Sequence, residues 1–172
     1  MTEAYTNKLL MIDLSCSSFE IIPLSDSLKQ MFLGGKGFGA KLLVDMVPPG
    51  TDPLGPDNYL MFMTGPLTGT MAPAMRGCVV TKSPLTGIFL DSYFGGNFSP
   101  EIKYAGYDGI LIKGIAKKPS YIWIDDDRVE IRDAKGIWGT DTLESNRLIK
   151  QELGDESIKI AGIGQAGENQ VH

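Results

Sequence analysis

Cysteine and histidine are scarce in this chain of 172 residues, which has only Cys16, Cys78 and His172. Zinc sites and iron–sulfur clusters need about four thiolate or imidazole ligands, so the chain cannot build such a centre by itself. A single histidine also excludes a Ser-His-Asp or Cys-His catalytic group. Because the two cysteines form no CxxC pair, we expect both to be buried or half-buried apolar residues in a reducing cytoplasm.

Clustered positive charge and long apolar runs are missing as well. The formal net charge is −5, and the lysines and arginines form no basic cluster, which argues against a nucleic-acid partner. No segment approaches about 18 consecutive apolar residues, and no basic region followed by an apolar stretch opens the chain. We therefore expect a cytoplasmic protein without a membrane partner.

Glycine, in contrast, is abundant, with 21 residues in a chain that is otherwise of ordinary globular composition. Its most informative use is in residues 65–70, 76–87 and 91–97, which we interpret as short strands joined by glycine loops. Glycine lets backbone N–H groups approach a bulky or anionic ligand closely, and the guanidinium of Arg76 suits phosphate. This combination indicates a site for a large phosphorylated cofactor.

Hydrophobic periodicity and capping residues predict the elements of the first part of the chain. The expected elements are a hairpin of strands 9–14 and 19–22, a helix from Ser25 that ends at Gly34, a helix over 40–46, strands at 59–63, 78–81 and 88–90, a short helix with Ser99 as N-cap, and a strand over 109–113. Gly35 to Ala40 formally fit a dinucleotide-binding fingerprint, but they follow a helix rather than a strand. We therefore expect a helix–helix turn there.

The second part of the chain repeats the start of the first. A hairpin of strands 121–125 and 129–132 is followed by a helix over 142–153 and a strand over 158–161. We interpret this as an internal duplication of strand–helix–strand units within an α+β fold of mixed β-sheets and a few helices. The three aspartates 125–127 lie at a hairpin tip and are expected to form the turn rather than bind metal.

Six blocks of the sequence also resemble, in order, the N-terminal domain of the tungsten-containing aldehyde ferredoxin oxidoreductases. These blocks are residues 33–37, 65–69, 81–87, 104–108, 129–134 and 164–169. The resemblance covers nearly the whole chain, although no single block is specific. It implies that residues 1–172 form a tungstopterin-binding domain, the base on which a tungsten or, alternatively, a molybdenum bis-pterin rests.

The resemblance also assigns roles to individual residues. Arg76 matches the arginine that contacts the pterin cofactor. Gly95 is implied as a backbone contact to the cofactor, and Gly96 as a position of close approach. Tyr93 stands where aldehyde-oxidising members commonly have an asparagine beside the magnesium ion that bridges the pterins, so only its main-chain carbonyl could bind that ion. No catalytic residue is expected in this domain.

The function implied by the resemblance is that of an oxidoreductase of anaerobes, which converts aldehydes to carboxylic acids and passes electrons through a [4Fe–4S] cluster to ferredoxin. Cluster and substrate residues are expected in later domains, so the chain alone is expected to be inactive and to hold no cluster. The alternatives are a non-catalytic pterin-binding or assembly module, or a subunit of a related aromatic acyl-CoA reductase.

The repeat carries a further expectation about the C-terminal part of the chain. The first unit continues for several strands after its glycine turn, whereas the second stops within a few residues, so we expect a domain truncated at its C-terminal end. An unfinished unit leaves a sheet edge open. We therefore expect self-association by edge pairing or by swapping of residues 165–172, or else disorder of that segment, and a homo-oligomer in the complete enzyme.

Overall fold

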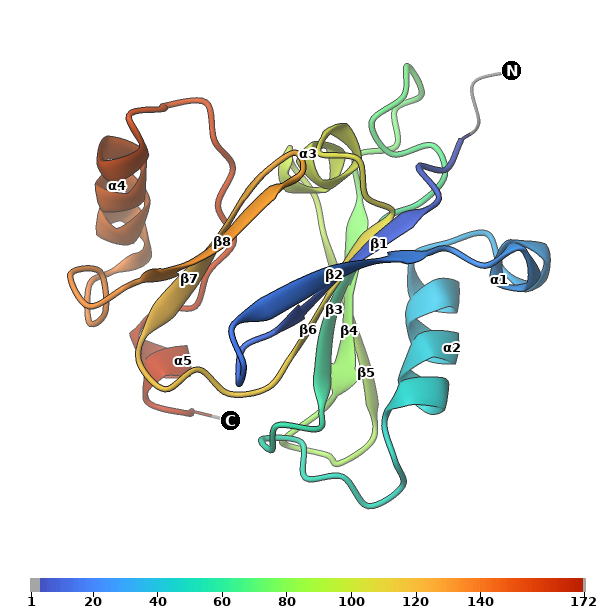
Figure 1. Ribbon diagram of the computed structural model, residues 1–172, viewed down its shortest axis with the longest axis horizontal. Helices are drawn as coiled ribbons and strands as arrows, with labels where there is room; N and C mark the ends of the chain where they lie inside the picture. Colours follow the sequence, from blue (N-terminus) through green and yellow to red (C-terminus); the bar gives the residue numbers. More distant parts are fainter. Residues whose placement is uncertain (1–3, 172) are drawn as a thin grey trace.

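The computed structural model describes residues 4–171, which form three layers around a central mixed sheet (Figure 1). The first part of the chain contains β1 (Lys8–Asp13), β2 (Ser18–Pro23), α1 (Asp26–Met31), α2 (Lys36–Met46), β3 (Tyr59–Met63), β4 (Gly77–Lys82), β5 (Phe89–Phe94), α3 (Phe98–Tyr104) and β6 (Gly109–Lys113). The second part contains β7 (Ser120–Asp125), β8 (Arg128–Asp133), α4 (Thr142–Leu153) and α5 (Gln165–Glu168). This arrangement confirms the α+β class.

The central sheet has the strand order β2-β1-β6-β3-β4-β5. Strands β1 and β6 are parallel, with Leu10 opposite Ile110, and every other neighbouring pair is antiparallel. Strand β6 therefore separates β1 from β3, although both precede it in the chain. This insertion places the carboxyl end of β3 beside the amino end of β6.

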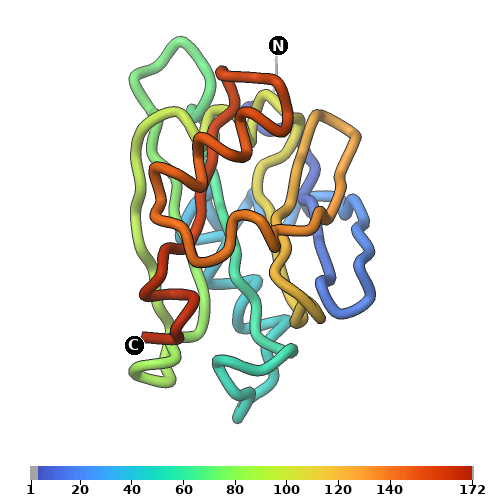
Figure 2. Tube along the Cα trace, turned by 90° about the vertical axis from the view of Figure 1, so that its left-hand side faces the viewer, coloured from blue at the N-terminus to red at the C-terminus, as the bar shows by residue number. Residues whose placement is uncertain are grey.

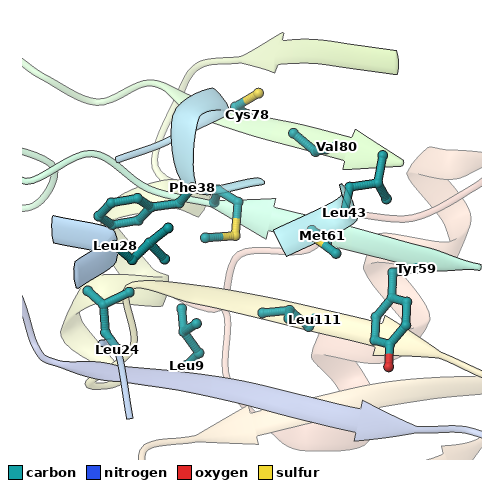
Figure 3. Packing of buried hydrophobic residues seen from close by; sticks show 11 residues of the cluster. Leu9, Leu24, Leu28, Phe38, Leu43, Tyr59, Met61, Cys78, Val80 and Leu111 are labelled. Carbon is teal, nitrogen blue, oxygen red and sulfur yellow. The ribbon is translucent and has the colours of Figure 1, made fainter. Parts of the chain in front are cut away.

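Each face of the sheet carries its own apolar core, because successive side chains of a strand point to opposite faces. Helices α1 and α2 cover one face, where Phe38 and Leu43 pack against Met61, Val80 and Leu111 (Figure 3). The other face is covered by α3 and by the hairpin β7–β8, which supplies Val129. The two cores make the central strands β1, β3 and β6 the most buried part of the molecule.

The expectations for the first part are confirmed, with four corrections. Strand β5 runs from Phe89 to Phe94, well beyond the expected end at residue 90. Helix α2 begins at Lys36 instead of residue 40, directly after the glycine turn. Asn97, not Ser99, is the N-cap of α3, and the Ser99 side chain is buried. Cys16 is exposed in the β1–β2 turn rather than buried, whereas Cys78 is buried as expected.

The second part confirms a hairpin and a helix but not the strand that was to follow. Hairpin β7–β8 forms a separate two-stranded sheet, and α4 ends at Gly154 in the left-handed conformation. Residues 158–161 form no strand, because a strand needs a hydrogen-bonded neighbour and the described residues supply none. Figure 2 shows the chain after α4 running along the molecule to α5 instead.

Among residues 4–171 we find no helix with the length and apolar composition that a membrane crossing requires.

Candidate functional site

A shallow hollow of about 290 Å³ lies where the α1–α2 turn and the β3–β4 loop meet at the end of the central sheet. Its lining comes from that turn, the carboxyl end of β3 and the loop after it, the start of β4 and the carboxyl end of β5. The residues that line it are Leu33, Gly34, Gly35, Met63, Gly65, Pro66, Arg76, Gly77, Cys78 and Tyr93. Two of the four expected site residues, Arg76 and Tyr93, therefore share one surface.

The α1–α2 turn reaches the hollow because it is bonded to the end of β3. The Gly35 N–H donates to the carbonyl of Thr64 over 2.8 Å. Gly34 has a φ of 142°, and a Cβ there would lie 3.0 Å from the same carbonyl oxygen. Only glycine fits such a conformation and such a close approach. The helix–helix turn expected from the sequence is thus confirmed, and it forms one wall of the hollow.

The β3–β4 loop places Arg76 in the lining of the hollow. Gly65 N–H donates to the hydroxyl of Thr68 over 3.2 Å, and that hydroxyl donates to the Arg76 carbonyl over 3.5 Å. These bonds hold the two ends of the loop together at the buried Thr68. The side chain of Arg76 itself is exposed, and within the described residues it makes no hydrogen bond or ion pair.

Gly77 allows β4 to begin directly after Arg76 while packing tightly on α3. A Cβ at this position would lie 2.1 Å from Ser99 Oγ and 2.5 Å from the ring of Phe94. The absence of a side chain therefore fixes how closely the start of β4 approaches α3, and with it the position from which the Arg76 side chain leaves the backbone.

Tyr93 forms the third wall, opposite Cys78 in the antiparallel register of β4 and β5. Its side chain is exposed, while its pKa is raised by desolvation and by a hydrogen bond with Asp91. Asp91 in turn pairs with Lys36 Nζ over 3.2 Å. Burial, followed by the negative charge of Asp91, raises the pKa of the Cys78 thiol. Both groups are therefore protonated at neutral pH, so neither is an activated nucleophile.

Gly95 and Gly96 lie in the exposed turn that follows β5, outside the lining of the hollow. Gly96 has a φ of 80°, which favours glycine, and a Cβ at either position would meet nothing within 4 Å. The structure therefore places these two residues near the site on the same strand end as Tyr93, without packing that requires them to be small.

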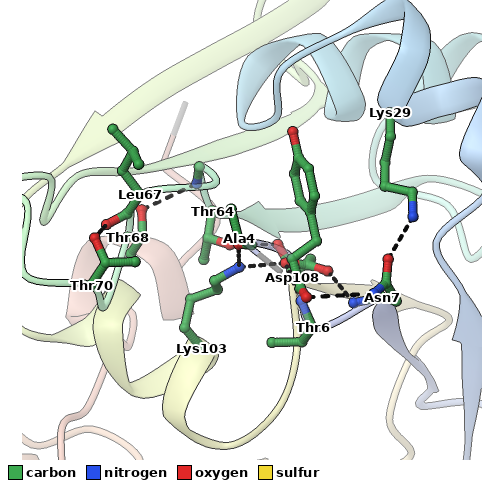
Figure 4. A network of polar contacts seen from close by, with 12 residues as sticks. Ala4, Thr6, Asn7, Lys29, Thr64, Leu67, Thr68, Thr70, Lys103 and Asp108 are labelled. Atoms are coloured by element: carbon green, nitrogen blue, oxygen red, sulfur yellow. Dashed lines mark hydrogen bonds and ion pairs between the residues drawn. The ribbon is translucent and has the colours of Figure 1, made fainter. Parts of the chain in front are cut away.

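A buried ion pair behind the hollow was not anticipated from the sequence. Lys103 Nζ lies 2.5 Å from Asp108 Oδ1, and their side chains are 7% and 2% exposed. The Asp108 carbonyl accepts hydrogen bonds from both the backbone N–H and the hydroxyl of Thr64 (Figure 4). The signal in the sequence was an acidic residue placed directly before the apolar run of β6.

The described residues contain no group of three or more His, Cys, Asp or Glu side chains that could hold a metal ion. At the tip of β7–β8, Asp126 has a φ of 52°, which confirms the turn expected for the three aspartates.

The hollow offers an exposed arginine fork, glycine backbone and apolar walls. These features fit the binding of a flat, anionic group, because backbone atoms can approach the group closely and the Arg76 guanidinium can pair with its charge.

Comparison with known proteins supplies independent findings. Residues 9–172 match the model of the aldehyde ferredoxin oxidoreductase N-terminal domain. A tungsten-containing aldehyde ferredoxin oxidoreductase of Pyrococcus horikoshii is 45% identical over 97% of this chain and 28% of its own length. The aliphatic sulfonate oxidoreductase WOR-like subunit of Pyrococcus furiosus is 38% identical over 98% of this chain and 29% of its own length.

A solved structure is similar in fold as well as in sequence. A chain of the active-site complex BamBC of benzoyl coenzyme A reductase, solved with 1,5-dienoyl-CoA, matches with a TM-score of 0.96 and 41% identity. The match covers 99% of this chain and 26% of that one. The chain thus spans little more than a quarter of the length of the relatives it matches.

Proposed function

Because this chain belongs to the aldehyde ferredoxin oxidoreductase family, whose N-terminal domain it matches, we propose that it is the platform for a tungsten bis-pterin. The observation that carries the proposal is the meeting of Arg76, Tyr93 and the Gly34–Gly35 turn around one hollow. A platform of this kind contributes binding and orientation, and the bound group supplies the oxidation–reduction chemistry.

Within the hollow, each residue has a proposed part. The Arg76 guanidinium binds phosphate oxygens of the cofactor through its fork of N–H donors. The glycine turn at Gly34 and Gly35 lets backbone atoms approach a planar ring. Gly95 and Gly96 provide backbone contacts beyond the hollow, and the main-chain carbonyl of Tyr93 is the proposed ligand of a bridging magnesium ion.

The whole enzyme is proposed to oxidise aldehydes to carboxylic acids with ferredoxin as electron acceptor. Its [4Fe–4S] cluster and its substrate pocket would come from residues beyond this domain, since Cys16 and Cys78 are too few to bind a cluster. We further propose a cytoplasmic enzyme that assembles as a homo-oligomer. Molybdenum in place of tungsten is the alternative for the metal.

A second candidate is a subunit of an aromatic acyl-CoA reductase. The similarity to the benzoyl coenzyme A reductase complex favours it, because 41% identity with a TM-score of 0.96 is close to the 45% identity shared with an aldehyde oxidoreductase. Assay of the enzyme expressed from its complete gene separates the two functions. Reduction of ferredoxin by aldehydes supports the first, and turnover of an aromatic acyl-CoA without aldehyde oxidation supports the second.

The platform itself is tested by Arg76→Ala in that enzyme, with Arg147→Ala as the matched control. Arg147 is an exposed arginine on α4, remote from the hollow and paired with Glu144. Removing a charge-assisted contact worth about 1.5–3 kcal/mol should lower the bound tungsten and pterin in the Arg76 variant alone. Full metal and pterin content in Arg76→Ala would refute the platform as assigned to this hollow.

A further inference from the structure

Asp108 connects two parts of the chain behind the hollow. Its buried carboxylate binds the N-terminal segment, and its main-chain carbonyl binds Thr64 at the end of β3. We infer that Asp108 is a positioning residue for the cofactor site, which acts through Thr64 on the two glycine turns that line the hollow. The inference rests on the proposed function, because it assumes that the hollow holds the cofactor.

The side chain of Asp108 is anchored on the N-terminal segment and on α3. Its Oδ2 accepts the Asn7 N–H over 2.8 Å, and its Oδ1 accepts the Thr6 N–H over 3.2 Å and a Lys103 N–H over 2.5 Å. Lys103 also donates to the carbonyl of Ala4 over 2.9 Å. Hydrogen bonds to a buried charged group are the stronger kind, so they hold residue 108 in one place.

The backbone of Asp108 is hydrogen-bonded to the residue that follows β3. Its carbonyl oxygen accepts the Thr64 N–H over 3.1 Å and the Thr64 hydroxyl over 2.8 Å. Thr64 is the residue between β3 and the Gly65 turn, and its own carbonyl accepts the Gly35 N–H. Figure 4 shows Thr64 beside Asp108, and Thr64 is 2% exposed, so this step of the path is shielded from solvent.

The other end of β6 shows what a merely structural ion pair looks like. There Lys113 and Asp13 lie 3.2 Å apart with side chains 33% and 23% exposed. A buried pair such as Lys103–Asp108 is weak evidence for stability, because desolvation of the two charges offsets their attraction. Its value lies in fixing geometry, and this pair occupies the end of β6 that faces the hollow.

The test compares Asp108→Asn and Thr64→Val in the holoenzyme from the complete gene. Thr64→Val removes only the hydroxyl that donates to Asp108, so it remains informative if Asp108→Asn fails to fold. Thr81→Val is the matched control, since Thr81 lies at the opposite end of β4 from the hollow and accepts a bond from Asn58 over 3.2 Å. Val129→Ala shortens a core side chain of β8, so it shows how a loss of stability alone changes metal retention and hydrogen exchange.

We expect tungsten to be lost to a chelator about tenfold faster from Asp108→Asn and Thr64→Val, with both controls close to wild type. Hydrogen exchange should also rise in residues 33–38 and 64–70, and not in those segments of the controls. Unchanged metal retention and exchange in a folded Thr64→Val would overturn the inference. Equal metal loss from Val129→Ala would reduce Asp108 to a structural role. If Arg76→Ala also retains its metal, the proposed function fails as well.

Discussion

The two halves of the chain begin with the same local pattern and end in different environments. Hairpin β1–β2 belongs to the six-stranded sheet, whereas hairpin β7–β8 forms a separate two-stranded sheet that packs against one face of the larger one. After residue 114, the buried apolar side chains among the described residues are Val129, Ala134 and Ile149. The second hairpin and its helix therefore bury much less apolar surface than the first part of the chain.

Residues 158–161 keep the alternation of half-buried and exposed side chains that is typical of a strand, although they form none. Ile158 and Ile160 are half-buried, and Lys159 and Ala161 between and after them are exposed. This is the period of two that predicted a strand. The residues thus retain the pattern of a strand without a neighbour among the described residues that would hydrogen-bond to them.

Hydrogen exchange should give the largest contrast between the halves. Amides of β1 and β6 should exchange only on global unfolding, whereas those of residues 158–163 should be close to unprotected. Mass spectrometry of peptides from the two segments measures the difference. Strong protection of residues 158–163 in a monomer, as judged by light scattering, would contradict the comparison.

Truncation of a core side chain should produce the next largest effect. Leu111→Ala, in the fully buried centre of β6, should lower the free energy of unfolding by about 2–5 kcal/mol. Ile149→Ala, in α4, should lower it by less because its surroundings can relax toward solvent. Chemical denaturation measures both, with the exposed Leu143→Ala as control. A larger loss from Ile149→Ala would reverse the ranking of the two halves.

Replacing glycine by alanine should destabilise the protein at Gly77 but not at Gly136, because only Gly77 is closely packed. Gly77→Ala should destabilise by about 1–3 kcal/mol, because the new Cβ meets Ser99 and Phe94. Gly136, in the turn after β8, has no atom within 4 Å of such a Cβ, so Gly136→Ala should be nearly neutral. Thermal unfolding distinguishes the two. Equal midpoints for both variants would show that β4 can shift away from α3.

Loss of a helix cap should affect the second half more than the first. Asp141 accepts hydrogen bonds from the backbone N–H groups of Leu143 and Glu144 over 2.9 and 2.8 Å, whereas the cap bond of Ser25 is from the Leu28 N–H over 3.2 Å. Asp141→Ala should destabilise by about 1 kcal/mol and Ser25→Ala by less. Circular dichroism during denaturation measures both, and the opposite order would mean that tertiary packing alone holds α4.

The smallest expected effect is a pH dependence on the surface of β8. Hydrogen bonds from Arg132 and Arg128 lower the pKa of Glu130 below its ordinary value of 4.5. The ionised form therefore stabilises the fold above the unfolded pKa, and this contribution is lost as the pH falls through the folded pKa. Glu130→Gln should be slightly less stable than wild type at about pH 7, and the difference should vanish in acid, below the folded pKa of Glu130. A difference that persists in acid would rule out this origin.

Local elements could be predicted from the sequence because their signals are local. The hairpins, the Ser25 cap and the Gly154 end of α4 each depend on residues within one or two turns of the chain. Ser99 misled the prediction because its hydroxyl is buried between α3 and β4 instead of capping the helix. That contact joins residues 22 apart, which capping rules do not consider.

The candidate site could be predicted only in part for the same reason. Arg76 and Tyr93 were named from resemblance, and the register of β4 with β5 brings them to one hollow. The Lys103–Asp108 pair and its bonds to Thr64 depend on the insertion of β6 between β1 and β3. No spacing along the chain encodes that insertion, because it is decided by which strands fit together after collapse.

The central position of β6 also sets an order on folding during synthesis. Leu9 pairs with Gly109, so the middle of the sheet cannot close until about 100 further residues have left the ribosome. Until then β1 and β3 each present an open edge of apolar strand, which is the kind of surface that recruits chaperones or neighbouring chains. Contacts this distant in sequence form slowly. The hollow proposed as the cofactor site, whose glycine turns are bonded to Asp108 through Thr64, is thus completed only after the last strand of the central sheet has been made.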